Sequence, residues 1–200
     1  MERIDFIIKR VFNLYFLILI SFIMAGFSLS NLNNEEIEII TPNVSKEESI
    51  HNDMVLLDYA SDDIVIFHSY FGLFVYDIKS KKIIRSLDLE NLNLHQIQGD
   101  NSCEITVNND TSIIQLSTVP KESMYIYNIE DNILLKSKYK DMKNKSDTKI
   151  KPYEIQGDNQ FMVLYGVEFD NGDFGYLKTE DSTIESLEYI RGDNHYKIFE

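Results

Sequence analysis

The sequence predicts an all-β protein whose antiparallel strands form a repeated, propeller-like meander behind one N-terminal transmembrane helix. Three observations predict this fold class. Short runs of β-branched and aromatic residues alternate with turn residues, no segment after residue 53 keeps a helical period, and similar segments recur about every 50 residues. The 200-residue chain then divides into a membrane anchor or signal peptide (1–30), a polar tether (31–53) and a β-propeller-like domain (54–200).

The predicted anchor is an apolar run over residues 11–29. Arg3, Lys9 and Arg10 precede it and an acidic stretch follows it, which places the N-terminus in the cytoplasm and the rest of the chain outside. The run approaches the length of about 20 apolar residues that a spanning helix needs. The alternative is a signal peptide cleaved among the small residues at 26–30, which would release a secreted protein.

The strands are predicted from runs rich in Ile, Val, Tyr and Phe that are bounded by Asp, Asn, Gly or Ser. Asp170-Asn171-Gly172-Asp173 is the strongest hairpin signal, because Asn-Gly supplies the two positive-φ residues of a type I′ turn. Residues 79–81, 108–110 and 130–132 are weaker turn signals. The predicted strands are 64–67, 73–76, 82–85, 105–107, 113–116, 125–127 and 161–165.

An internal repeat relates these strands. The tyrosines of three similar segments, Tyr76, Tyr127 and Tyr176, are spaced by 51 and 49 residues. A Gly-Asp-Asn triplet also occurs three times, and we predict that its glycines, Gly99, Gly157 and Gly192, occupy equivalent turns. Periods of this length are typical of propeller blades. About three units fit the chain, whereas closed propellers have four or more blades, so the predicted body is an open or partial ring, or two sheets packed face to face.

Composition and residue spacing restrict the ligands and reactions that the chain can support. The net charge of −14 disfavours nucleic acid as a binding partner. Cys103 is the only cysteine in the sequence, so an intramolecular disulfide is excluded. The four histidines, His51, His68, His95 and His195, have no metal-ligand spacing, so we predict no metal, cofactor or catalytic residue. Acidic pairs fall in predicted turns, where Asp and Asn are favoured by backbone geometry. These pairs are Asp62/Asp63, Glu130/Asp131, Asp170/Asp173 and Glu180/Asp181.

Two further patterns are weak. Ser-x-x-Lys occurs at Ser137 and Ser146, without the partner motifs of acyl-serine enzymes. Arg191-Gly192-Asp193 matches an integrin tripeptide but is also the third repeat turn. A loop at 136–151 carries seven lysines and is either a solvated insertion or a positive patch facing anionic lipid or cell-wall polymer.

An ordered set of motifs stands at residues 60–63, 65–77, 83–89, 98–101 with Cys103, 124–127 and 170–177. Together they resemble a domain found at the extracytoplasmic C-terminus of some β-lactam-sensor-like metallopeptidase receptors of low-GC Gram-positive bacteria, and in stand-alone membrane proteins. The resemblance implies a cell-surface location and a sensory or accessory role. It does not imply a peptidase, because the chain has no zinc motif. The family often has a second cysteine nine residues before the one matching Cys103, but Leu94 stands there.

We therefore expect a non-enzymatic, extracytoplasmic binding or sensory module held at the cell membrane through residues 11–29. Its expected partner is a membrane-receptor protein or a cell-envelope ligand. One alternative is a cell-envelope hydrolase whose site is built from turn carboxylates, such as Asp63, Asp131 and Asp181. Another is a structural accessory that contacts a receptor through an exposed sheet edge.

Overall fold

The computed structural model describes residues 37–45, 55–95, 103–156, 161–179 and 186–199. The apolar run at 11–29 and the first residues of the predicted tether lie outside these ranges. Within the described ranges, no helix is long and apolar enough to cross a membrane.

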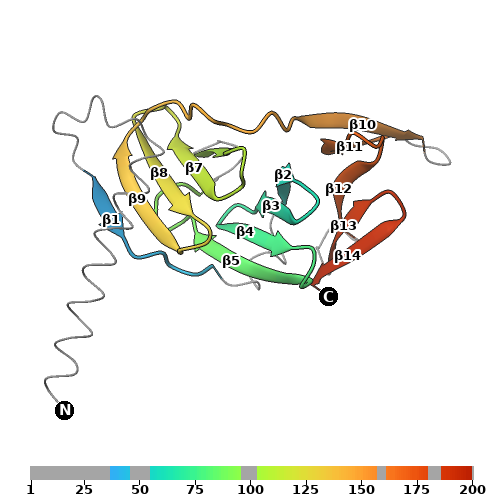
Figure 1. Ribbon diagram of the computed structural model, residues 1–200, viewed down its shortest axis with the longest axis horizontal. Coiled ribbons are helices and arrows are strands. Elements are labelled where there is room, and N and C mark those ends of the chain that lie inside the picture. The colour runs from blue at the N-terminus through green and yellow to red at the C-terminus, as the bar shows by residue number, and fades with distance from the viewer. Residues whose placement is uncertain (1–36, 46–54, 96–102, 157–160, 180–185, 200) are drawn as a thin grey trace, which may run out of the picture. The chain divides into compact units, whose positions relative to one another are not determined.

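The described part of the chain is all-β, as predicted, and its strands form three antiparallel sheets (Figure 1). One sheet contains four strands in chain order: β2 (Leu56–Ala60), β3 (Ile64–His68), β4 (Gly72–Asp77) and β5 (Lys82–Asp88). A second sheet has the order β1-β9-β8-β7-β6 and the third runs from β10 to β14.

The remaining strand bounds complete the two five-stranded sheets. The second sheet is built from β1 (Glu38–Ile40), β6 (Cys103–Val107), β7 (Ile113–Thr118), β8 (Ser123–Asn128) and β9 (Ile133–Lys138). The third is built from β10 (Ile150–Gln156), β11 (Phe161–Glu168), β12 (Phe174–Thr179), β13 (Leu187–Arg191) and β14 (Asn194–Phe199).

Strands β3 and β4, in the middle of the β2–β5 sheet, are buried on both faces. Because side chains alternate along a strand, the consecutive residues Ile66 and Phe67 of β3 enter different cores. Ile66 packs in a cluster with Leu116 and other residues of the β6–β9 strands. Phe67 packs in a second cluster with Tyr189 of β13. This sheet therefore connects the other two, and burial on both faces explains why β3 and β4 are nearly continuous apolar runs.

Two hairpins have the same construction. In the β4–β5 turn, Asp77 Oδ1 accepts from the Ser80 amide, and Lys81 has a positive φ. In the β8–β9 turn, Asn128 Oδ1 accepts from the Asp131 amide at 2.8 Å, and Asn132 has a positive φ. The tyrosine before each turn, Tyr76 or Tyr127, is fully buried. The sequence alignment of these segments therefore corresponds to equivalent local structure.

The three Gly-Asp-Asn triplets connect different kinds of strand pairs. Residues 99–101 fall between β5 and β6, which belong to different sheets. Residues 157–159 fall between β10 and β11, and Gly192 falls between β13 and β14, so the three triplets occupy different steps of the meander. Gly99 and Gly157 themselves lie outside the described residues, while Gly192 has φ +54°. The Gly-Asp-Asn triplet recurs in the sequence because Gly, Asp and Asn are favoured in many kinds of turn.

The β structure begins before residue 54, the predicted start of the β domain. Residues 38–40, assigned to the tether, form β1 and extend the second sheet at the edge of β9. The chain then runs against β5, where the Asp88 amide donates to the Asn43 carbonyl at 2.8 Å and Ser86 Oγ donates to the Ser45 carbonyl at 2.9 Å. A three-residue edge strand in an acidic, polar stretch is too short to stand out in the sequence.

The lysine-rich loop is shorter than predicted. Its first residues end β9, and its last two, Ile150 and Lys151, begin β10. Pro152 is tolerated in β10 because this strand is an edge strand of its sheet.

Candidate functional site

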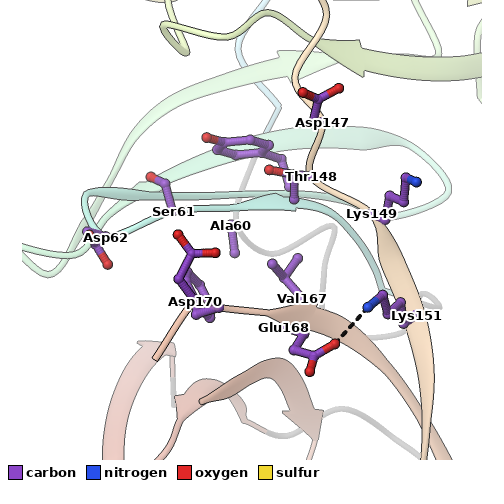
Figure 2. Close-up of a pocket in the computed structure, with 12 residues that line it drawn as sticks. Ala60, Ser61, Asp62, Asp147, Thr148, Lys149, Lys151, Val167, Glu168 and Asp170 are labelled. Carbon is purple, nitrogen blue, oxygen red and sulfur yellow. Dashed lines mark hydrogen bonds and ion pairs between the residues drawn. The ribbon is translucent and has the colours of Figure 1, made fainter. Parts of the chain in front are cut away.

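A pocket of about 560 Å³ opens between the end of β2, the segment that leads into β10 and the end of β11 (Figure 2). This volume lies in the range of small-molecule sites, about 300 to 1,000 Å³. Its walls combine aromatic, aliphatic, hydroxyl, carboxylate and ammonium groups. They are Tyr59, Ala60, Ser61, Asp62, Asp147, Thr148, Lys149, Lys151, Val167, Glu168, Phe169 and Asp170.

Ser61 shapes the wall on the β2 side. Its Oγ accepts hydrogen bonds from the amides of Asp63 (3.2 Å) and Ile64 (3.1 Å), and its own amide donates to the Ile64 carbonyl at 2.9 Å. A serine hydroxyl satisfies turn amides in this way without a repeating ladder. The turn ends β2 and directs Asp62 outward, where its side chain is 80% exposed.

The β11–β12 turn shapes the opposite wall. The Gly172 amide donates to the Phe169 carbonyl and the Phe169 amide donates to the Asp173 carbonyl, both at 2.9 Å. The hairpin was predicted correctly, but its type I′ turn was not, because among the described residues Gly172 has a positive φ and Asn171 does not. The observed loop has three residues, a turn followed by one left-handed glycine, which is the next commonest hairpin connection.

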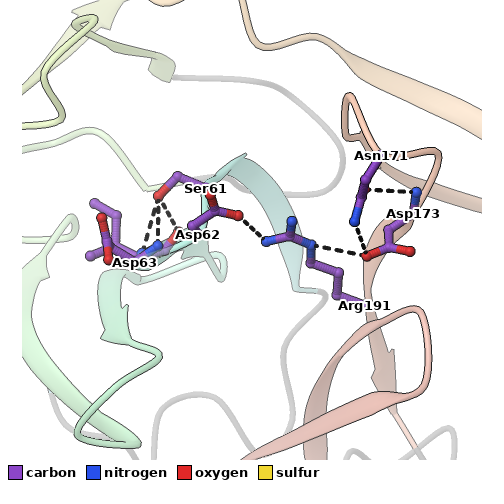
Figure 3. A network of polar contacts seen from close by, with 7 residues as sticks. Ser61, Asp62, Asp63, Asn171, Asp173 and Arg191 are labelled. Atoms are coloured by element: carbon purple, nitrogen blue, oxygen red, sulfur yellow. Dashed lines mark hydrogen bonds and ion pairs between the residues drawn. The ribbon is translucent and has the colours of Figure 1, made fainter.

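Arg191 of β13 joins the two turns (Figure 3). Its guanidinium lies 3.6 Å from the centre of the Phe169 ring. Nη1 lies 2.5 Å from Asp62 Oδ1, and Nε lies 3.6 Å from Asp173 Oδ2. The arginine side chain is only 17% exposed, so it packs as well as pairs. Because Asp62 and Phe169 both line the pocket, Arg191 positions one end of it.

The pocket carries both signs of charge. Lys151 Nζ donates to Glu168 Oε2 at 2.6 Å. This hydrogen bond and the lysine charge lower the pKa of Glu168, which therefore stays ionised at neutral pH. The carboxylates of Asp62, Asp147 and Asp170 and the ammonium of Lys149 line the same space. Such a lining can bind a polar ligand that offers both donors and acceptors.

A second polar pair lies in the β2–β3 hairpin. Asp58 stands where the register between β2 and β3 shifts, a bulge that redirects its side chain. His68 Nδ1 lies 2.7 Å from Asp58 Oδ2, and both side chains are largely buried. Burial alone would lower the pKa of His68, but the charge and hydrogen bond of Asp58 outweigh it and raise that pKa.

Cys103, at the start of β6, is half-buried and packs against the first core cluster. Burial, followed by the charge of Asp58, raises the pKa of its thiol, so the nucleophilic thiolate is disfavoured. In the part of the chain that the structure describes, no three His, Cys, Asp or Glu side chains are grouped to hold a metal ion. Leu94, the position of the second cysteine in the resembling family, is a buried core residue.

The turn carboxylates predicted as an alternative site are only partly brought together. Asp63 lies in the β2–β3 turn, Asp131 lies in the β8–β9 turn and Asp181 lies outside the described residues. Two other turn carboxylates, Asp62 and Asp170, line one pocket. Sequence reasoning missed the role of Arg191 and the Asp58–His68 pair. Because Asp58 and His68 lie in adjacent strands, the sequence could have suggested that they pair. The bulge that orients the Asp58 side chain has no clear sequence signal.

Comparison with known proteins adds no relative: no protein-family model and no curated protein matches this chain. The pocket and the polar clusters are therefore interpreted from their own geometry.

Proposed function

We propose that this protein is a non-enzymatic binding or sensory module, displayed outside the cell and held at the membrane by residues 11–29. We further propose that its three sheets are blades of an open, propeller-like body. The stacking of the β2–β5 sheet between the other two supports this, as do the matched β4–β5 and β8–β9 hairpins. The resemblance to extracytoplasmic receptor domains supports the location.

One observation carries the binding role: the pocket of about 560 Å³ with its mixed polar and aromatic lining. Tyr59 and Phe169 offer apolar surface, while Ser61 and Thr148 offer hydroxyl groups and the charged side chains offer both signs. This chemistry suits a polar cell-envelope fragment that carries hydroxyl, amino and carboxyl groups. A cofactor is not part of the proposal.

Binding can be tested on the full chain in detergent by calorimetric titration with soluble peptidoglycan fragments. Thr148→Trp, which fills the pocket from a half-buried lining position, is expected to abolish saturable binding. Thr179→Trp, at the exposed end of β12 and outside the pocket, is the matched control and should leave binding unchanged. Equal binding by both variants would contradict a ligand in this pocket.

A cell-envelope hydrolase is the second candidate, because Asp62 and Asp170 line the same pocket. Hydrolysis by two carboxyls requires one to remain protonated as the acid. Glu168, a third carboxyl of the pocket, is unsuited to be that acid, because the hydrogen bond and charge of Lys151 lower its pKa. Turnover of the same fragments by the wild type that disappears in Asp62→Asn or Asp170→Asn would establish the hydrolase and overturn the binding module.

A further inference from the structure

We propose that the lysine segment, residues 138–151, is a contact surface for anionic phospholipid headgroups. This inference rests on the membrane attachment in the proposed function. The segment contains six lysines and two aspartates in a chain whose net charge is −14. It is thus a local positive region on an acidic protein.

The backbone of the lysine segment is held against the second sheet. The Lys140 carbonyl accepts from Gln115 Nε2 at 3.0 Å, and the Asn144 carbonyl accepts from the Asn109 amide at 2.9 Å. The Ser146 amide donates to the Val107 carbonyl at 2.8 Å. Met142 points inward and is only 8% exposed. A segment fixed in this way is not a loose solvated insertion, because its backbone groups and one apolar side chain have partners in the sheet.

Its lysine side chains, in contrast, are exposed: Lys138, Lys140, Lys143, Lys145, Lys149 and Lys151. Lys151 pairs with Glu168, and the carboxylate of Asp141 accepts from the Tyr139 hydroxyl. Asp147 is the other acidic residue of the segment. The fixed backbone therefore presents a row of ammonium groups in excess over the acids between them.

The length of the chain between the predicted anchor and β1 limits how far this row of lysines can lie from the lipid. In the β1–β9 pairing Glu38 faces Lys136, so the chain N-terminal to β1 leaves the sheet beside Lys138. Seven residues, 30–36, separate the apolar run from Ile37. Even fully extended, seven residues reach at most about 25 Å. The start of the lysine segment is therefore attached to the anchor by a short connection.

The distribution of charge determines which face of the β body approaches an anionic membrane surface. The full chain has a net charge of −14, so an anionic membrane repels the acidic body but attracts clustered lysines within about a Debye length. Each lysine near such a surface biases the equilibrium toward contact roughly fivefold. Contact through the lysine segment is then the favoured orientation of the body.

The test is lysine footprinting of the full chain reconstituted into vesicles. An amine-acylating reagent is applied in phosphatidylcholine vesicles with and without phosphatidylglycerol, and labelling is read at each lysine by mass spectrometry. Lys138, Lys143 and Lys145 are expected to react several-fold more slowly in the anionic vesicles. The difference should vanish in molar salt, where the Debye length falls to about 3 Å. Lys79, Lys81 and Lys82 of the β4–β5 turn should react equally in both.

Matched variants sharpen the test. Lys138→Gln, Lys143→Gln and Lys145→Gln together should remove the protection of Lys149. The control set Lys79→Gln, Lys81→Gln and Lys82→Gln changes the net charge equally and should preserve it.

Three results would overturn the inference in distinguishable ways. A chain extracted from the vesicles by alkaline carbonate would overturn the anchor as well as the lipid contact. An inserted chain with equal labelling in both lipids would overturn the lipid contact alone. Protection produced by soluble polyphosphate but not by phosphatidylglycerol would assign the surface to an anionic polymer instead.

Discussion

Arg191 illustrates how one side chain can position a site without belonging to its lining. Its salt bridge with Asp62 contributes little stability, because Asp62 is 80% exposed and solvent screens the pair. The stacking on Phe169 is better protected, since the guanidinium is mostly buried. The planar, delocalised guanidinium stacks on the ring and pairs with both carboxylates at once, which the ammonium group of a lysine cannot do.

We therefore expect Arg191→Lys to lower the free energy of unfolding by about 1–2 kcal/mol, although it keeps the charge. Urea unfolding followed by circular dichroism measures this change. Lys82→Ala, which removes an exposed lysine at the start of β5 and outside the Asp62 and Asp173 turns, should change stability by less than about 0.5 kcal/mol. A fully stable Arg191→Lys protein would show that the stacking contact is unimportant.

The Asp58–His68 pair predicts a pH dependence. Because the pKa of His68 is raised in the folded state, its stabilising contribution is complete below the unfolded value of about 6.5 and is lost as pH rises through the folded pKa. A ring-proton NMR titration should place the pKa of His68 above about 6.5. In Asp58→Asn, where burial remains without the charge, that pKa should fall below the same value. An unchanged titration in the variant would refute the coupling.

At the scale of elements, the hairpins follow local chemistry closely. Asp77 and Asn128 each accept the amide three residues later, and the following Lys81 or Asn132 takes a positive φ. These contacts depend on neighbours in sequence, so the turn residues at 79–81 and 130–132 predicted the positions of both turns. The β11–β12 turn differs from the predicted type I′ turn because its loop has three residues, whereas a type I′ hairpin loop has two.

Two glycines of this hairpin should respond differently to alanine. Gly172 has φ +87° and open space around it, so Gly172→Ala should cost about 1 kcal/mol from backbone conformation alone. Gly172→Asn should cost less, since Asn tolerates positive φ. At Gly166 a Cβ would lie within 2.3 Å of the Gly175 carbonyl oxygen, and Gly166→Ala should cost about 3 kcal/mol. Thermal unfolding midpoints test whether Gly166→Ala costs more than Gly172→Ala. A larger decrease in midpoint for Gly172→Ala would contradict this prediction.

At the scale of the whole described body, the β2–β5 sheet holds the other two. The Tyr76 hydroxyl donates to the Lys197 carbonyl at 3.2 Å on one side. On the other side Arg85 donates to the Ile129 and Glu130 carbonyls. Apolar cores lie on both faces, so unfolding of this sheet exposes both.

Neighbouring substitutions on β3 test this arrangement. Ile66→Ala and Phe67→Ala damage different cores, and each should cost about 2–5 kcal/mol because both side chains are fully buried. If the central sheet couples the cores, each variant retains one cooperative transition in urea. Separate transitions in either variant would show that the sheets unfold independently.

The sequence alone determined the all-β class, the positions of most turns and the location of acidic pairs within those turns. These features depend on the period of apolar residues and on the conformational preferences of Gly, Asn and Asp, which are local properties. The matching of Tyr76 with Tyr127 was likewise visible, because both precede the same kind of turn.

Only the tertiary structure decided which turns meet. The Arg191 contacts with Asp62 and Phe169 join β13 to turns far away in sequence, and the Asp58 bulge depends on strand pairing. The pocket lies between the end of β2, the segment that leads into β10 and the end of β11, and the edge strand β1 exists because β9 offers unpaired backbone groups. Such contacts are set by how the sheets stack and pair across long separations, and no local pattern of residues encodes them.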